Sequence, residues 1–353
     1  MSAKTSRTRI MFNILFPAVC YFVFVYPVFR LSNWYFSGDG ISFIQSLLLW
    51  AVALGGMYYS FSGPKMKVRY LVVHWMGVSF VFACLTLIGE MLRIVSPVAD
   101  QTVVTGILLF GVVLVIGAVA FSHHLTVKSH DVYSKKVSRS YRVGQISDVH
   151  IGSRQGGYMR RIVNRLNQLE LDCVVITGDL IDSSAVDYDA LESIGLLDAK
   201  TYFIIGNHER YADLDKILEI ARRLGVRTLR QESDRHHELV FTGIDDADRK
   251  DQVEIHLPAI EQDQEKFNIL LYHRPVGWES AMEHGIDLML SGHTHNGQIF
   301  PFNYVVKQQF SRIRGMYINQ HHHLYVSSGT GTWGPLMRLG SLNEISVMQI
   351  RPH

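Results

Sequence analysis

Long apolar runs dominate the first third of the chain. Four of them have membrane length, and they cover residues 11–29, 41–61, 70–91 and 102–121. About 20 helical residues cross a hydrocarbon core of about 30 Å, so each run predicts a transmembrane helix. The first run could instead be a secretory signal peptide, but no small-residue cleavage pattern follows it and three more apolar runs do. The pattern predicts an all-α membrane domain of four transmembrane helices over residues 1–127.

Beyond residue 141 the pattern changes to short apolar runs that end in turn residues and alternate with amphipathic stretches. The short runs predict strands at 143–147, 173–177, 202–205, 239–242, 268–272, 288–290, 324–327 and 345–350. The amphipathic stretches predict helices at 158–169, 188–196, 213–224 and 277–284. This alternation is typical of one α/β domain, which we expect at 143–353 behind a basic juxtamembrane linker at 128–142.

Composition and charge also divide the chain into two unlike parts. The hydrophobic share of 48% is high for a wholly soluble protein. Residues 1–127 hold 8 Lys and Arg and 3 Asp and Glu, a net charge of +5, whereas the rest holds 26 and 29, a net charge of −3. The negative balance of the rear part argues against broad nucleic-acid binding.

The basic residues also predict the orientation in the membrane. Lys and Arg gather before the first run, between the second and third runs, and after the fourth. The other two connections hold one each, Arg30 and Arg93. Because short cytoplasmic loops carry the excess of Lys and Arg, both termini and the α/β domain should face the cytoplasm.

Several polar residues could have a functional role, but a structural or solvent-exposed role explains each of them more simply. Glu90 lies near the end of the third run with Arg93 three residues on, which favours an interfacial ion pair. The run His321, His322 and His323 indicates a solvated strand entry rather than a third metal site. Arg160, Arg161 and Arg165 could meet anionic headgroups or a substrate phosphate, although a solvated helix face is the better interpretation. The three cysteines have no spacing typical of a disulfide framework or a thiolate metal site.

Metal-ligating residue types follow five of the predicted strands. They are Asp148 and His150, then Asp179, then Asn207 and His208, then His273, and finally His293 and His295. A single Asp or His after a strand is ordinarily a turn residue or a helix cap. In α/β sheets, however, ligands collect at the carboxyl ends of strands, and five such coincidences indicate a shared site.

The residue types and spacings favour metal chemistry. In extended backbone, residues i and i+2 point to the same side, so Asp148 and His150 can face one ion, as can His293 and His295. Oxygen and imidazole donors without cysteine suit Mn²⁺, Fe or Zn²⁺. Seven ligands suit two ions, and Asp179 is the best candidate to bridge them because a carboxylate has two oxygens to share.

The ordered blocks resemble the calcineurin-like metallophosphoesterase superfamily. They read DVH at 148–150, GDLID at 178–182, GNHE at 206–209, His273, and GHTH at 292–295. The resemblance covers residues 141–350 and leaves out the four apolar runs. GQI at 297–299 and GTG at 329–331 are further similar to a bacterial membrane-associated branch that includes lipid-precursor pyrophosphatases. One departure is Asn296, where this branch often has Gly; Asn tolerates positive φ, so we expect the turn to survive.

The resemblance implies a fold and a set of roles. The fold is an αββα sandwich of two mixed sheets. One metal ion would be held by Asp148, His150, Asp179 and His295, and the other by Asp179, Asn207, His273 and His293. His208 would stabilise phosphoryl oxygens and protonate the leaving group. Asp182 and Glu209 would orient ligands or cap backbone.

These expectations combine into one function and two alternatives. We expect a membrane-anchored phosphodiesterase or pyrophosphatase that hydrolyses a lipid-linked or nucleotide-linked phosphate with water activated by two divalent ions, Mn²⁺ before Fe or Zn²⁺. The alternatives are a phosphomonoesterase for a soluble substrate and a catalytically silent metal-binding scaffold or sensor. The expected location is a bacterial inner membrane, with membrane lipids and a phosphoester as partners.

Overall fold

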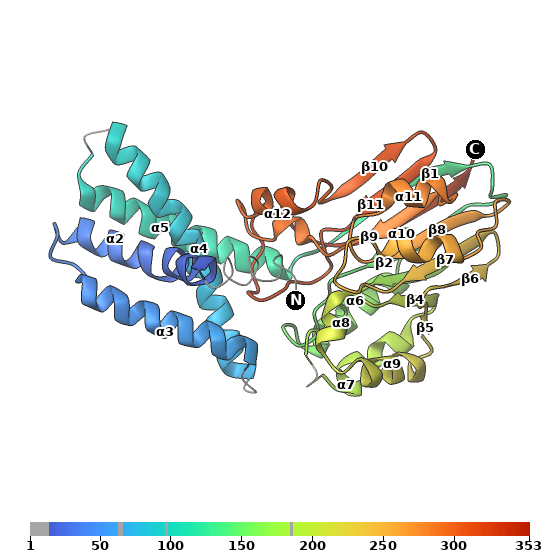
Figure 1. Cartoon of the computed structure of the whole chain (residues 1–353), viewed down its shortest axis with the longest axis horizontal. Coiled ribbons are helices and arrows are strands. Elements are labelled where there is room, and N and C mark those ends of the chain that lie inside the picture. Colours follow the sequence, from blue (N-terminus) through green and yellow to red (C-terminus); the bar gives the residue numbers. More distant parts are fainter. Residues whose placement is uncertain (1–13, 63–65, 96–97, 184–185) are drawn as a thin grey trace, which may run out of the picture. The chain divides into compact units, whose positions relative to one another are not determined.

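The computed structural model describes residues 14–62, 66–95, 98–183 and 186–353. The chain divides into two compact units, Met1–Val119 and Ala120–His353 (Figure 1). Residues 11–13 of the first predicted span, the basic N-terminal tail and Lys65 lie outside the described residues.

The first unit consists of apolar helices that are long enough to cross a membrane. They are Ile14–Tyr35, which contains the π-helical turn η1 (Tyr21–Val25) and α2 (Tyr26–Tyr35), then α3 (Phe43–Ser62), α4 (Met66–Val95) and α5 (Asp100–His123). Each predicted span lies on one of these helices, so the prediction of four membrane helices is confirmed. Inside this unit Phe24 and Val25 of the first helix pack with Ala53 of α3 and Val72 of α4.

Glu90 of α4 has a different main partner from the one expected. Arg30 Nε lies 2.6 Å from Glu90 Oε1, whereas Arg93 reaches Glu90 Oε2 only at 3.7 Å. Arg93 instead donates two hydrogen bonds, of 2.6 and 2.8 Å, to the carboxylate of Asp100. The sequence spacing suggested the local pair of Glu90 and Arg93. The packing of α2 against α4 instead brings Arg30 closer to Glu90.

The second unit contains two six-stranded mixed sheets. The first has the order β1 (Leu125–Ser134), β12 (Asn343–Pro352), β2 (Tyr141–Ile146), β3 (Cys173–Thr177), β4 (Lys200–Ile204) and β5 (Arg227–Thr228). The second has the order β10 (Gly315–Asn319), β11 (His322–Val326), β9 (Leu288–Ser291), β8 (Phe267–Tyr272), β7 (Leu239–Ile244) and β6 (Glu232–His236). In the first sheet β2 to β5 run parallel, and in the second β7, β8, β9 and β11 do.

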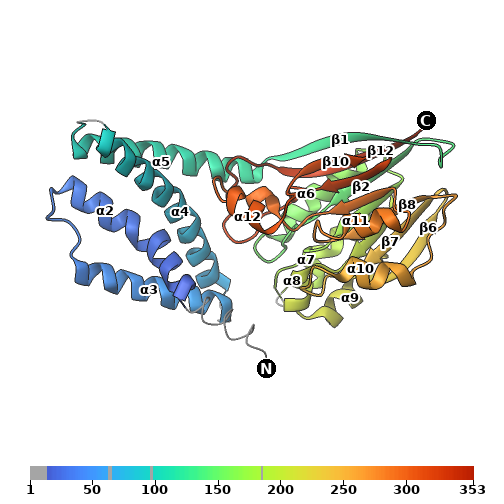
Figure 2. The same ribbon diagram turned by 45° about the horizontal axis from the view of Figure 1, so that its top comes forward.

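Helices cover the outer face of each sheet, so the predicted αββα sandwich is confirmed (Figures 1 and 2). The first sheet packs against α6 (Gly156–Asn167), α7 (Tyr188–Leu191), the 3-10 helix η2 (Glu192–Leu196) and α9 (Leu214–Arg223). The second packs against α10 (Gln252–His256), the 3-10 helix η3 (Leu257–Ala259) and α11 (Trp278–Glu283). Between the sheets Tyr202 stacks on Phe241 at 4.5 Å. Three short elements lie in the connections after strands: α8 (Asn207–Tyr211), the 3-10 turn η4 (His295–Gly297) and α12 (Asn303–Gln309).

The predicted linker at 128–142 is wrong for its first half. Leu125–Ser134 forms β1, which pairs in parallel with β12 from Leu125↔Asn343 to Ser134↔Pro352. The strand escaped prediction because it lies at a sheet edge and is largely solvated, so its sequence does not alternate cleanly between apolar and polar. A single residue, His124, therefore separates the last membrane helix from the first strand of the second unit.

Candidate metal centre

The residues predicted to form the site come together from both sheets. Three connections of the first sheet and two of the second supply them: β2 is followed by Asp148 and His150, β3 by Asp179, β4 by Asn207 and His208, β8 by His273, and β9 by His293 and His295. These connections meet where the carboxyl ends of the parallel strands face one another, the usual ligand edge of such sheets. All of the predicted residues lie in this one cluster or beside it.

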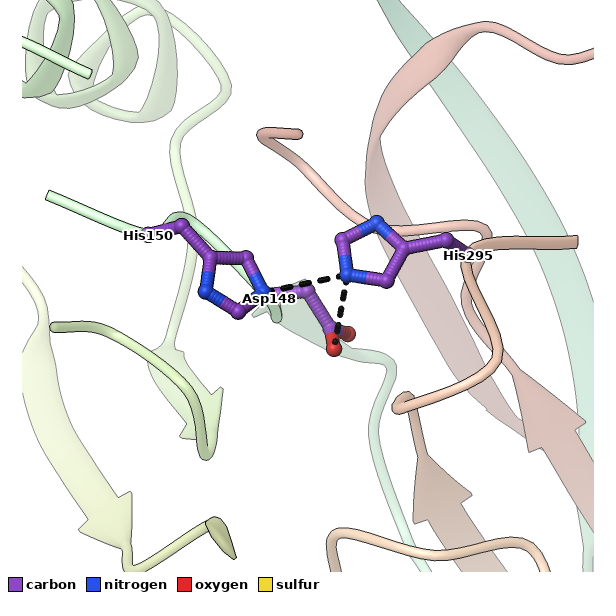
Figure 3. A group of neighbouring side chains, drawn as sticks. All are labelled: Asp148, His150 and His295. Carbon is purple, nitrogen blue, oxygen red and sulfur yellow. Dashed lines mark hydrogen bonds and ion pairs between the residues drawn. The ribbon is translucent and has the colours of Figure 1, made fainter. Parts of the chain in front are cut away.

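Asp148, His150 and His295 form one group that could hold a metal ion. Figure 3 shows the two imidazole rings approaching from opposite sides above the Asp148 carboxylate. Their Nε2 atoms are 3.0 Å apart, and His295 Nε2 lies 3.4 Å from Asp148 Oδ1. All three side chains are buried. The donor atoms therefore converge on a point that water reaches poorly.

Asp179, His273 and His293 form a second group. His273 Nε2 lies 3.1 Å from Asp179 Oδ2, and His293 Nδ1 lies 3.2 Å from His273 Nε2. Asp179 Oδ2 is also 3.9 Å from His150 Nε2. Asp179 thus lies between the two groups, with one carboxylate within reach of both.

The backbone is strained where these side chains are presented. Asp148, His150, Asp179, His293 and His295 all have positive φ, between 48° and 70°. Such values are uncommon for residues other than glycine, and each costs roughly 1–3 kcal/mol. The strain is the physical cost of turning five side chains from strand ends toward one point. Asn296 also has a positive φ of 51°, which Asn tolerates.

Glu209 supports the centre from behind, through backbone amides. Its fully buried carboxylate accepts hydrogen bonds from the amides of Asp179, Leu180 and Ile181 at 2.7 to 3.1 Å, and from Gly206 at 2.8 Å. A Cβ on Gly206 would lie 2.2 Å from Asp179 Oδ1, so only glycine lets the two loops approach. The carboxylate therefore fixes the loop that presents Asp179.

Replacing Glu209 by Gln should destabilise the protein by about 3 kcal/mol, because a carboxamide offers one acceptor and directs N–H groups at backbone donors. This corresponds to a melting temperature lower by roughly 6–12 °C. The measurement is thermal unfolding of the full chain in detergent with a chelator present, so that lost metal does not contribute. Glu192→Gln, an exposed partner of Arg160, is the matched control. Equal melting temperatures for the two variants would contradict this role.

Asp182 and His273 are held by similar contacts. Asp182 accepts a hydrogen bond from the Ser153 amide at 3.0 Å, and its Oδ2 lies 3.9 Å from His150 Nδ1. His273 Nδ1 lies 2.7 Å from the Thr177 carbonyl oxygen, which leaves Nε2 facing Asp179. These neighbours set the ring orientations, as supporting hydrogen bonds do in metal sites.

The charge state of the cluster suits cations. Burial lowers the pKa of His150, His293 and His295, so these imidazoles are neutral and offer lone pairs. Burial raises the pKa of Asp148 to about 6. Burial alone would lower the pKa of His273, but the charge of Asp179 and its hydrogen bond raise it to about 10. The buried Asp179 carboxylate thus draws positive charge toward itself.

One buried polar atom supports the fit to metal ions. Asn207 Oδ1 has no hydrogen-bond partner among the described residues. A buried acceptor without a partner is costly, so Asn207 Oδ1 is suited to bind a cation. Carboxylate, amide and neutral imidazole donors are the set that Mn²⁺, Fe and Zn²⁺ accept, so the residues present fit divalent ions.

His208, like His293, is partly accessible. Its side chain is 16% exposed, and Nε2 lies 4.0 Å from Asp179 Oδ2. Its amide donates a hydrogen bond of 2.9 Å to Asp179 Oδ1. His208 also belongs to a third group of possible ligands with His150 and Asp179. It can therefore serve either at the solvent side of the centre or as a ligand.

Arg338 is a buried cation that the sequence reasoning missed. Its guanidinium donates to the carbonyl oxygens of His295 at 2.9 Å and Gly331 at 2.6 Å, and to Asn343 Oδ1 at 2.9 Å. Burial lowers its pKa to about 10, although the charge of Glu344 acts in the opposite direction. An Arg in a turn-like stretch far along the chain gave no sequence signal.

The other polar groups singled out in the sequence lie outside the cluster. Arg160 pairs with Glu192 on an exposed helix face at 2.9 Å. His322 begins β11, and its Nδ1 lies 2.6 Å from the Ile286 carbonyl oxygen. Among the described residues the groups able to hold a metal include none of these side chains.

Comparison with known proteins agrees with the fold and the site. Residues 141–297 match the family model for calcineurin-like phosphoesterases. An uncharacterized metallophosphoesterase of Helicobacter pylori is 34% identical over 236 residues, which are 64% of this chain and 64% of that protein. The match thus spans less than two thirds of that relative.

A second relative matches a larger share of this chain. The Danio rerio transmembrane protein with metallophosphoesterase domain is 31% identical over 306 residues, 76% of this chain and 68% of that protein. Among solved structures, phosphopantetheinyl hydrolase from Mycobacterium tuberculosis covers 57% of this chain and 96% of its own, at 12% identity and a TM-score of 0.36. That likeness is too distant to bear on activity. On the strength of its relatives, this membrane protein belongs to the calcineurin-like phosphoesterases, a family of metal-dependent hydrolases.

Proposed function

We propose that the chain hydrolyses a phosphodiester or diphosphate linkage with two divalent metal ions. The observation that carries this proposal is the position of Asp179 between two groups of possible ligands. A shared carboxylate is the arrangement that two-metal hydrolases need, because it holds both ions a few ångströms apart. Mn²⁺ is the ion we expect first, given the oxygen and imidazole donors.

The ligand sets follow the strand ends. Four residues hold one ion: Asp148, His150, Asp179 and His295. Four hold the other: Asp179, Asn207, His273 and His293. Two neighbouring histidines of the β9 loop would therefore serve different ions.

Such ions lower the pKa of a water molecule and neutralise phosphoryl oxygens. The protein supplies orientation and a proton. His208, next to the ligand Asn207 and partly accessible to solvent, stabilises a phosphoryl oxygen and donates a proton to the leaving group. Glu209 keeps Asp179 in place, and the His293 amide donates to Asp148 Oδ1 at 3.0 Å, which fixes that carboxylate.

The number of membrane helices favours one class of substrate over another. Four spans exceed what anchoring requires, which favours a lipid-linked phosphate over a nucleotide-linked one. The excess of Lys and Arg before and after the spans supports a domain at the cytoplasmic face of a bacterial inner membrane. A soluble phosphomonoester is the second candidate, and a silent metal-binding scaffold or sensor is the third.

The proposal is tested with purified full chain in detergent, Mn²⁺, and two chromogenic esters. We expect bis(4-nitrophenyl) phosphate to be cleaved at least about tenfold faster than 4-nitrophenyl phosphate, and a chelator to abolish both activities. A reversed preference would favour a monoesterase. Bound metal without cleavage of either ester, or of a diphosphate, would favour the scaffold or sensor.

A further inference from the structure

The connection from η4 to β10 carries an exposed apolar surface beside the metal centre. None of the residues of α12 is buried. Phe300 is 51% exposed, Phe302 45%, Tyr304 59% and Val305 49%. A surface helix ordinarily buries one apolar stripe against its own domain, and α12 lacks that burial. Figures 1 and 2 show α12 beyond the ends of the strands, stacked on neither sheet.

Basic side chains border this apolar surface. Lys307 and Arg314 are exposed and line a groove of about 320 Å³ together with Phe300 and Asn303. The groove also reaches Asn296, the residue after the candidate ligand His295. A positively charged groove that starts beside a phosphoesterase centre suits an anionic phosphate group.

The surface is coupled to the centre by direct contacts. Phe310, the residue after the end of α12, packs its ring 5.2 Å from the ring of His293. The Lys250 ammonium lies 5.0 Å from the Phe310 ring and donates to the Gln309 carbonyl oxygen at 2.9 Å. A partner bound to α12 would therefore lie at the rim of the metal centre.

From these observations we propose that Phe300, Phe302, Tyr304, Val305, Lys307 and Arg314, here called the α12 surface, contact the headgroup region of a lipid bilayer. Aromatic rings next to Lys and Arg are the composition of interfacial membrane contacts. The chain itself keeps a bilayer within reach, since one residue joins its last membrane helix to β1. The metal centre then takes its phosphoester from the membrane surface, a consequence that rests on the proposed function.

The first test measures what covers the α12 surface in the full chain. Tyr304→Cys receives a nitroxide label in a background with Cys20, Cys84 and Cys173 replaced by alanine, reconstituted in nanodiscs of phosphatidylethanolamine and phosphatidylglycerol. Leu196→Cys, an apolar position that is 65% exposed on η2, is the matched control. We expect the label at 304 to collide with oxygen more than with a water-soluble nickel chelate, and the label at 196 to show the reverse.

Two results would overturn the proposal. Equal access of the nickel chelate to both labels would mean that the α12 surface faces water. Shielding of the label at 304 from both reagents would mean that protein covers it, either the chain's own helices or a second copy. Neither result depends on catalytic activity.

The second test asks whether the surface serves catalysis. Phe302→Glu with Tyr304→Glu should lower the rate on hexadecyl 4-nitrophenyl phosphate, relative to the rate on bis(4-nitrophenyl) phosphate, by about tenfold. The control pair is Leu196→Glu with Ile255→Glu, both exposed apolar positions. An unchanged ratio would contradict the inference, whereas a wild-type chain that cleaves neither ester would contradict the proposed function alone.

Discussion

Replacing Asp179 by Asn should lower kcat by at least about 1,000-fold and leave about one metal ion or fewer per chain. The reason is geometric and electrostatic. Asp179 is the side chain within reach of both groups of ligands. Burial alone would raise its pKa, but the charge of His273 and its hydrogen bond hold that pKa well below the usual value, so the carboxylate is anionic. Asn is similar in shape but lacks the second anionic oxygen, so it cannot hold two cations.

The measurement is metal content after dialysis, together with the rate on bis(4-nitrophenyl) phosphate. Asn retains an Oδ1 that can accept the His208 amide now bonded to Asp179 at 2.9 Å, so the fold should persist. Asp215→Asn, in the first turn of α9, controls for loss of a carboxylate elsewhere. Full metal content in the Asp179 variant would contradict a shared ligand.

Replacing His208 by Ala should leave metal content unchanged and lower kcat by about 100- to 10,000-fold. His208 is partly exposed, and its Nε2 lies 4.0 Å from Asp179 Oδ2, so it lies near the centre without being fully buried. Because its proposed task is to protonate the leaving group, the loss should be larger for a phenyl ester than for a 4-nitrophenyl ester. A merely structural role would lower both rates equally.

The matched control is His237→Ala, an exposed histidine remote in sequence from the site. Metal loss in the His208 variant equal to that in the Asp179 variant would contradict the assignment. It would instead identify His208 as a ligand, a role that its place in a group with His150 and Asp179 allows.

Much of the site could be predicted because its chemistry lies in short segments. Asp148 and His150, and His293 and His295, are each two residues apart, and every predicted ligand follows a buried strand. The hydrophobic pattern located those strands, and the carboxyl ends of parallel strands meet by necessity. The pattern failed at β1 because an edge strand with solvated faces has no clear apolar period.

The hydrophobic pattern of the sequence could not predict long-range contacts. Arg338 acts through carbonyl oxygens, which every residue has, so nothing in its neighbourhood distinguished it. Glu209 stood in a recognisable block, but its four amide partners come from two loops that only folding brings together. The exposure of Tyr304 and Val305 was equally invisible, since an apolar residue in sequence is expected to be buried.

The sequence by itself determined the membrane helices, the eight strands that it predicted and the types of metal-binding atoms, because periodicity and residue chemistry are local properties. The tertiary structure alone decided that two sheets bring five loops to one point, that Arg30 is the closer partner of Glu90, and that no residue of α12 is buried. These features depend on which distant segments come into contact. Those contacts are decided by burial and charge balance in the fully packed chain, which no local stretch of sequence contains.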